Sequence, residues 1–229
     1  MRDSITSTTI AADVQVWLLD DDRRALEYFA HILQTHQISC RTFDDPEKLL
    51  STSGPNPGCI LVDFRLGARD GLEVAAECRR RWPCCSIILI SGHATVPVAV
   101  AAMRQELDGV LEKPIDEDAL IHEVRSGFEL CHSRRIACDA QCDARVNIQQ
   151  LSQFELEILR LVTDGVPNKQ IASNLSLSLR TVEKHRNSLF RKLGVTSAAE
   201  ATRIWVLANL ERCPHDHRRD FPTPESGVN

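Results

Sequence analysis

The strongest constraint on the fold is an alternation of short apolar runs with longer amphipathic stretches over the first half of the chain. The apolar runs occupy positions 14–19, 39–43, 59–62, 86–90 and 109–111. The helical stretches that follow them occupy positions 23–34, 45–50, 72–81, 96–105 and 116–128. Five strands that alternate with five helices predict right-handed crossovers and a parallel sheet. Because the apolar runs are unbroken, we expect this sheet to be covered on both faces.

The second half of the chain carries a helical pattern only. Positions 133–149 are polar and mixed without a clear period, so we interpret 132–149 as an interdomain linker. Four helical stretches follow at 152–163, 168–175, 179–193 and 198–210. Two of them begin with a capping box, Ser152 with Glu155 and Ser197 with Glu200. The expected division is an α/β domain at 14–131, an all-helical domain at 150–212, and flexible termini at 1–13 and 213–229.

Length and charge limit the classes of protein that remain. A chain of 229 residues fits one or two domains. It has no apolar run near the roughly 18 residues that cross a bilayer, and its first 13 residues lack a hydrophobic signal core, so we expect a cytoplasmic protein with no membrane partner. The net charge is −5, yet positions 151–212 hold nine Lys and Arg against six Asp and Glu. This contrast favours, weakly, a polyanion-binding module joined to an acidic domain.

Polar side chains follow the predicted strands where each strand ends. Asp20 and Asp21 follow the first strand, Asp63 the third, Ser91 the fourth and Lys113 the fifth. The carboxyl ends of parallel strands meet at one edge of a sheet, so these groups should share one rim. Clustered carboxylates repel one another unless a cation lies among them, and all-oxygen ligands suit Mg²⁺. If Asp63 attacks a phosphoryl donor, the metal and Lys113 would neutralise the charge that develops.

These residues resemble the receiver domains of two-component response regulators over about 120 residues. The matches also include Gly71, Gly92 with His93, and Pro114. The resemblance implies a flavodoxin-like receiver with a cis peptide before Pro114. It implies that Asp63 is the phosphoacceptor, that Asp20, Asp21, Asp63 and the main-chain carbonyl of Arg65 bind Mg²⁺, and that Ser91 and Lys113 contact the phosphoryl group.

Three positions depart from the receiver pattern. Gly67 stands where proline is usual, Val110 where an aromatic residue is usual, and Glu106 where glycine is usual. An aromatic rotamer switch therefore cannot operate at Val110, and a phosphorylation-independent receiver stays an open alternative. A phosphatase with an aspartyl-phosphate intermediate is a second alternative, but Arg65 replaces the second aspartate of the Asp-x-Asp pair that such enzymes use. We therefore expect a regulator and not an enzyme.

The stretch 179–193 predicts an amphipathic helix with an apolar face and a mostly cationic face. A short turn at 176–178 separates it from the preceding helix, which is a helix-turn-helix arrangement. Positions 151–195 resemble the LuxR-type DNA-binding domain, with matches that include Glu155, Gly165, Thr181 and Gly194. Together the two domains resemble the FixJ/NarL subfamily of transcription factors.

The resemblance assigns the polar face of this helix to DNA. By the family's geometry, Glu183, Lys184 and Asn187 would contact bases. Phosphate contacts would come from Lys169, Arg180, Thr181, His185 and Arg191. The implied partners are double-stranded promoter DNA, a cognate sensor histidine kinase, RNA polymerase, and a second copy of the chain after phosphorylation. A solvated charged face, without DNA, is the alternative.

Two further features carry alternatives. The chain has nine cysteines, an odd number outside any regular framework, so we expect reduced thiols. Two groups could bind zinc, but both lack paired C-x2-C spacing, so we interpret them as incidental: Cys131, His132, Cys138 and Cys142, and then Cys213, His215 and His217. Phe154 replaces an arginine that the LuxR-type domain often carries, and either local packing or an enlarged interface would account for it.

Overall fold

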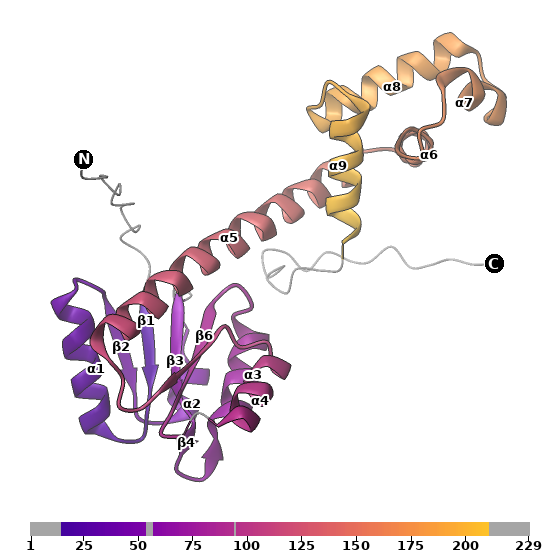
Figure 1. The fold of residues 1–229 in the computed structure, drawn as a ribbon. Helices are drawn as coiled ribbons and strands as arrows, with labels where there is room; N and C mark the ends of the chain where they lie inside the picture. Colours follow the sequence, from indigo (N-terminus) through magenta and orange to yellow (C-terminus); the bar gives the residue numbers. More distant parts are fainter. Residues whose placement is uncertain (1–14, 54–56, 94, 211–229) are drawn as a thin grey trace, which may run out of the picture. The chain divides into compact units, whose positions relative to one another are not determined.

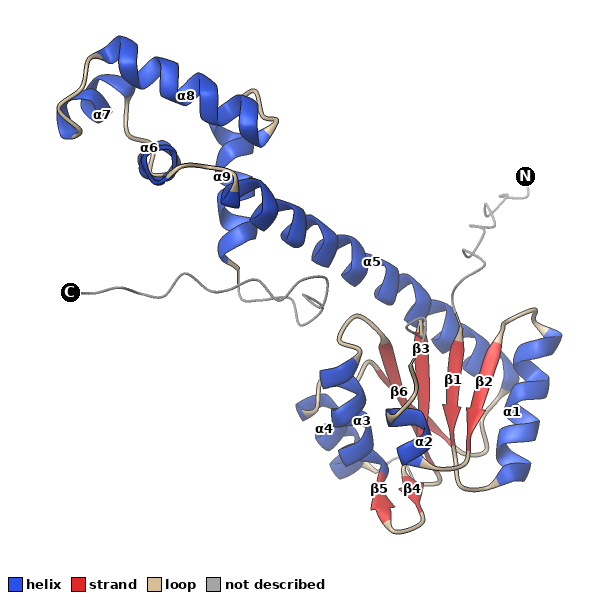
Figure 2. Ribbon diagram, turned by 180° about the vertical axis from the view of Figure 1, so that it is seen from behind, coloured by secondary structure: helices blue, strands red, loops and turns tan. Residues whose placement is uncertain are grey.

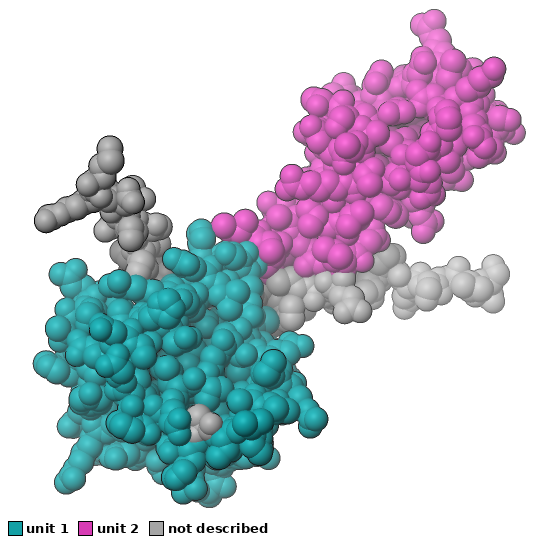
Figure 3. Space-filling view, viewed as in Figure 1, with its two compact units in different colours: residues 1–135 teal, residues 136–229 magenta. Residues whose placement is uncertain are grey.

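The computed structural model describes residues 15–53, 57–93 and 95–210, which form two compact units. The units comprise residues 1–135 and 136–229 (Figures 1 and 3). The boundary lies inside the segment that we interpreted as a linker. Both expected flexible termini, 1–13 and 213–229, lie outside the described residues. The second of them contains Cys213, His215 and His217, which we considered as a zinc site.

The first unit contains the predicted five-stranded parallel sheet (Figure 2). Its strand order is β2-β1-β3-β6-β7, and all neighbouring strands are parallel. The strands are β1 (Val16–Leu19), β2 (Cys40–Phe43), β3 (Cys59–Asp63), β6 (Ser86–Ser91) and β7 (Gly109–Glu112). The prediction of an α/β fold from alternating apolar runs is confirmed.

Helices cover both faces of this sheet, so two apolar layers form the core. On one face, α1 and α5 pack against the side chains of Leu18, Leu61 and Ile88. On the other face, α2 and α3 pack against Trp17, Ile60 and Ile87. The helices that begin in the described part of this unit are α1 (Arg23–Thr35), α2 (Pro46–Leu50), α3 (Gly71–Arg81), α4 (Val96–Arg104) and α5 (Glu117–Gln149).

Helix α5 is longer than the sequence pattern predicted. We expected a helix at 116–128 and then a linker without a regular period, but one helix runs from Glu117 to Gln149. Its buried face changes along its length. Val124 and Phe128 belong to the core of the first unit, whereas Ile148 packs against the core of the second. Because no single face of α5 stays apolar along its whole length, the sequence beyond residue 128 shows no helical period.

Asp108 fastens the middle of α5 to the first unit. The Nη2 atoms of Arg79 and Arg134 each lie 2.6 Å from a different carboxylate oxygen of Asp108. The main-chain N–H of Ile87 donates to the same carboxylate at 2.9 Å. Burial alone would raise the pKa of Asp108, but the hydrogen bonds from Arg134, Ile87 and Arg79 lower it. The charged carboxylate thus holds α3, β6 and α5 together.

In the described part of the second unit, up to residue 210, four short helices follow α5. They are α6 (Gln153–Thr163), α7 (Asn168–Asn174), α8 (Leu179–Leu193) and α9 (Ala198–Asn209). Their apolar faces meet in one core around Ile158, Leu159, Val182 and Leu189. The four helices confirm the helical pattern that the sequence predicted.

Of the two predicted capping boxes, one forms completely. The Ser152 side chain accepts from the N–H of Glu155, and the carboxylate of Glu155 accepts from the N–H of Ser152. Ser197 accepts from the N–H of Glu200, but the Glu200 carboxylate accepts from the N–H of Thr196 instead, at 2.7 Å. The second box is therefore only half formed, because the competing donor is one residue earlier.

Most cysteines that the structure describes are buried thiols. Cys59, Cys78 and Cys85 lie inside the sheet core, where burial raises the pKa of each thiol. Cys138 is disulfide-bonded, so the expectation of thiols throughout is wrong at that position. Among the helices at 15–53, 57–93 and 95–210, none is long and apolar enough to cross a membrane.

The departure at Glu106 has a structural consequence that can be measured. Glu106 adopts a φ of 55°, a left-handed conformation that suits glycine and strains other residues. We expect Glu106→Gly to raise the free energy of unfolding by about 1 kcal/mol relative to Glu106→Ala, since both variants lose the same carboxylate. Urea denaturation of the two variants measures the difference. Equal stabilities would show that the turn imposes no such strain.

Candidate functional site

Three carboxylates meet at the carboxyl ends of β1 and β3, as predicted. Asp20 and Asp21 directly follow β1, and Asp63 is the last residue of β3. One oxygen of each lies within 4.8 Å of the others. Asp20 and Asp63 are buried, with 4% and 7% of their surface exposed, whereas Asp21 is exposed. Burial raises the pKa of Asp20, and the nearby Asp63 charge adds to this effect, although hydrogen bonds from Lys113 and Asp22 oppose it.

Lys113 supplies the positive charge at the centre of this cluster. It follows β7, and its Nζ atom lies 2.9 Å from Oδ2 of Asp20 and 2.7 Å from Oδ1 of Asp63. Burial alone would lower the pKa of Lys113, but its hydrogen bonds to Asp63 and Asp20 outweigh burial and raise it. The lysine is therefore charged and bridges the ends of β1 and β3.

The main chain after Asp63 also contacts the cluster. The N–H of Arg65 donates to Oδ2 of Asp63 at 2.8 Å, so both oxygens of this carboxylate have donors. Gly71 donates to the carbonyl of Phe64, and a Cβ at Gly71 would lie 2.1 Å from the carbonyl oxygen of Asp63. Only glycine fits there, which explains the match that the sequence showed at Gly71.

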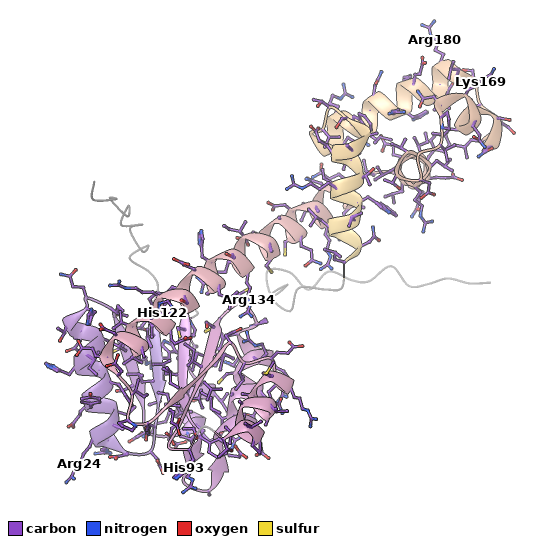
Figure 4. The ribbon with its side chains drawn as sticks, in the orientation of Figure 1. Arg24, His93, His122, Arg134, Lys169 and Arg180 are labelled. Atoms are coloured by element: carbon purple, nitrogen blue, oxygen red, sulfur yellow. The ribbon has the colours of Figure 1, made fainter. Side chains whose placement is uncertain are left out.

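The structure places Ser91 beside these groups at the end of β6. Asp63 pairs with Ile90, the residue before Ser91. The Ser91 side chain is buried, accepts from the N–H of His93 at 3.2 Å and donates to its carbonyl. In the view of Figure 4, His93 lies at the lower edge of the first unit. The Lys113–Pro114 peptide is cis, as the resemblance implied.

The donor set of this cluster suits a hard divalent cation. It consists of carboxylate oxygen atoms, one of them on an exposed residue, which leaves room for water. Within the described parts of the chain, these residues form the only group of three or more His, Cys, Asp or Glu side chains close enough together to share a metal ion. The cluster therefore fits Mg²⁺ better than a metal that prefers nitrogen or sulfur ligands.

A second candidate site lies on α7 and α8. The six exposed members of the predicted DNA-contacting set project from the surface of the second unit, as Figure 4 shows for Lys169 and Arg180. These six are Lys169, Arg180, Glu183, Lys184, Asn187 and Arg191. The buried face of the same helix carries Val182, Leu189 and Leu193. The division into an apolar and a polar face that we expected is present.

The other two predicted DNA contacts are Thr181 and His185. Both side chains are half-buried and contact other residues of the second unit. Ser178 caps the start of α8 by accepting from the N–H of Thr181 at 3.1 Å, and the two hydroxyls lie 2.7 Å apart. The His185 ring meets the Phe154 ring edge-on, with centroids 4.8 Å apart. Phe154 therefore packs locally, which is one of the two explanations for its presence. The sequence could not show this contact, because it joins residues from two different helices.

Glu155 has a larger role than its helix cap suggested. Its side chain is buried and reaches α8, where it accepts from Oγ of Ser188 at 3.0 Å and lies 2.6 Å from Nζ of Lys192. Burial alone would raise the pKa of Glu155, but the hydrogen bonds from Lys192, Ser152 and Ser188 lower it to about 2. One carboxylate thus caps α6 and holds α8 against it.

Comparisons with known proteins agree on both halves of the chain. Residues 16–125 match the family of response regulator receiver domains, and residues 149–205 match the bacterial regulatory proteins of the luxR family. The chain is 32% identical to the transcriptional regulatory protein FixJ of Azorhizobium caulinodans, over 85% of this chain and 93% of that one. It is 29% identical to the response regulator protein TodT of Pseudomonas putida, over 82% of this chain and 84% of that one.

One solved structure is similar to most of this chain. The low-resolution structure of response regulator StyR has a TM-score of 0.72 and 28% sequence identity, and the alignment covers 85% of this chain and 99% of that one. Because the alignment covers 85% of this chain, the similarity includes residues of both units and is not limited to the parallel sheet of the first.

The Glu155 network predicts a specific loss of stability in acid. The folded pKa of about 2 lies below the ordinary value of 4.5, so this carboxylate stabilises the fold above pH 4.5 and loses that effect as the pH falls towards 2. Over this pH range, we expect the free energy of unfolding of Glu155→Gln to fall by about 2 kcal/mol less than that of the wild type. Trp205 fluorescence during urea unfolding of residues 136–229, which contain no other tryptophan, measures it.

The matched control for this measurement is Glu157→Gln, which removes an exposed carboxylate from the same helix. It should follow the wild-type pH profile. If Glu155→Gln and the wild type lose stability in parallel between pH 5 and pH 2.5, the carboxylate does not hold α8 as described.

Proposed function

The chain belongs to the FixJ/NarL-type response regulators, and from this membership we propose that it converts phosphorylation of Asp63 into binding of promoter DNA. Residues 14–131 act as the receiver, 132–149 as the connecting segment and 150–212 as the DNA-binding domain. A sensor histidine kinase supplies the phosphoryl group, and the regulator acts in the cytoplasm, where the DNA is. The acidic cluster around Asp63 carries this proposal.

The environment of Asp63 suits a nucleophile for phosphoryl transfer. A carboxylate oxygen forms a bond to phosphorus while the N–P bond of the kinase's phosphohistidine breaks, and the released imidazole takes up a proton from solvent. The Nζ atom of Lys113, 2.7 Å from Oδ1 of Asp63, would offset the additional negative charge of the phosphoryl group. Ser91, at the end of the neighbouring strand, supplies a hydroxyl for the phosphoryl oxygen atoms once it leaves His93.

Asp20, Asp21, Asp63 and the main-chain carbonyl of Arg65 would hold Mg²⁺. When bound, the ion supplies positive charge that offsets the charge on the transferred group. The complete cluster favours phosphorylation over a receiver that works without it. The protein's membership of a family of transcription regulators, together with Arg65 two residues after Asp63, argues against a phosphatase.

Helix α4 supports dimerisation after phosphorylation. Val96, Val100 and Met103 occupy one face of this helix and are 77%, 42% and 76% exposed. Large apolar side chains spaced by four and three residues form a stripe that a second copy could cover. The proposed dimer uses the face made by α4 and β7, and pairing two weak half-site binders raises the affinity for DNA through effective concentration. At the promoter the dimer would contact RNA polymerase.

The phosphoacceptor is tested by Asp63→Asn. We expect this variant to incorporate no acid-labile phosphate from acetyl phosphate and Mg²⁺, because an amide cannot form the acyl phosphate. Asp22→Asn is the matched control, since Asp22 lies beside the cluster and caps α1, a role that asparagine also performs. The control should be labelled as the wild type is, and label retained by Asp63→Asn would refute the assignment.

The DNA face is tested by two lysines with different proposed roles. Lys184→Ala should change the base preference among sites selected from random DNA and cost about 1–3 kcal/mol at its preferred sequence. Lys169→Ala should weaken binding to all sequences and reduce the salt dependence by about one counterion. Selection followed by titration at two salt concentrations measures both. Equal losses without a change in base preference would contradict the division between bases and phosphates.

A further inference from the structure

The chain that follows Asp63 forms a small hairpin that the sequence did not predict. Strands β4 (Arg65–Leu66) and β5 (Arg69–Asp70) pair antiparallel, with Arg65 opposite Asp70 and Leu66 opposite Arg69. Gly67, the first of the two turn residues, has a φ of 59°. Proline is fixed near −65°, so the proline that is usual in receivers cannot occupy this turn. The departure at Gly67 therefore belongs to a distinct loop conformation.

This hairpin lies directly against the acidic cluster. The N–H of Arg65, on its first strand, donates to Oδ2 of Asp63. At the turn, a Cβ on Gly67 would lie 3.6 Å from Oδ2 of Asp21. The backbone of the hairpin thus contacts Asp63 and passes close to Asp21. A shift of the hairpin would displace groups that face a bound cation.

Strands of two residues cannot hold such a hairpin in place by themselves. Arg69 supplies the anchor. Its Nη1 atom lies 2.9 Å from Oε1 of Glu47 on α2, and its Nη2 atom lies 2.6 Å from Oε1 of Glu77 on α3. Single exposed ion pairs contribute little, but here one guanidinium that is 29% exposed joins two helices and the hairpin. Its planar fork of donors suits two carboxylates better than an ammonium does.

We propose that Arg69 is a positioning residue for phosphoryl transfer, which acts by fixing the β4–β5 hairpin to α2 and α3. The inference rests on the proposed phosphorylation of Asp63. Without Arg69, the main chain of Arg65 and Gly67 loses its fixed position beside Asp63 and Asp21. The cluster then binds Mg²⁺ less well, although every carboxylate of the cluster is still present.

The test compares Arg69→Ala with the charge-reversed pair Arg69→Glu/Glu77→Arg in the full-length protein. Arg125→Ala, which removes an exposed arginine from α5, is the matched control. The first readout is amide hydrogen exchange of residues 64–71 without metal, measured by mass spectrometry. The second is the affinity for Mg²⁺ alone, from amide NMR shifts. The third is the rate of phosphorylation by acetyl phosphate at saturating and limiting Mg²⁺.

We expect Arg69→Ala to accelerate exchange in the hairpin by roughly three- to tenfold and to weaken Mg²⁺ binding by roughly fivefold. Phosphorylation should slow at limiting Mg²⁺ and recover at saturating Mg²⁺. The charge-reversed pair should restore the exchange rate and the affinity in part, because it renews the ion pair with α3 but places a carboxylate beside Glu47 of α2. Arg125→Ala should match the wild type. If Arg69→Ala does not fold, Arg69→Lys, which can pair with one glutamate at a time, should give intermediate values.

Two negative results have different meanings. If the wild type takes no phosphate on Asp63, the proposed function fails. If the wild type is phosphorylated while Arg69→Ala keeps its hairpin exchange, Mg²⁺ affinity and rate, only the role of Arg69 fails. A charge-reversed pair that stays as impaired as Arg69→Ala would also overturn the proposal, since the ion pair with Glu77 would then not be the anchor.

Discussion

The contact of Lys113 with Asp20 and Asp63 is the interaction on which the rest of the first unit depends. Three carboxylates within 4.8 Å of one another repel, and burial makes the charge on Asp20 more costly still. One ammonium within 3 Å of two of them offsets this cost. It also joins the ends of β1, β3 and β7, which are far apart in sequence. One lysine does not neutralise three carboxylates, so the cluster keeps a net negative charge. A bound cation would neutralise this charge.

The proposed function follows from this unfinished charge balance. A cation and a phosphoryl group would change the charges around Lys113 and Ser91, and the regulator would then favour a different population of receiver conformations. Val110 in place of an aromatic residue excludes the usual rotamer switch at that position. The exposed apolar stripe on α4 is an alternative element through which the change could reach a second copy. In the DNA-binding unit, Glu155 and Phe154 fix the helix that would contact bases.

Much of this architecture was predictable, because strand ends in a parallel sheet must meet at one edge. From the sequence alone, that rule predicts that Asp20, Asp63 and Lys113 lie together. Other features depend on contacts between distant residues and leave no local pattern. The hairpin after Asp63 is too short for a strand period, and its anchor Arg69 pairs with Glu47 and Glu77 on separate helices. The sequence pattern did not predict the extension of α5 beyond residue 128, because the buried face of the helix changes between the first and the second core.

In the proposed function, charge added at the acidic cluster controls DNA binding by the other unit. The most direct measurement is the affinity of the full chain for a selected DNA site with Mg²⁺ alone and with Mg²⁺ plus beryllofluoride, a mimic of the phosphoryl group. The account predicts binding at least roughly tenfold tighter with beryllofluoride. An unchanged affinity, while fluorine NMR shows beryllofluoride bound at Asp63, would contradict it.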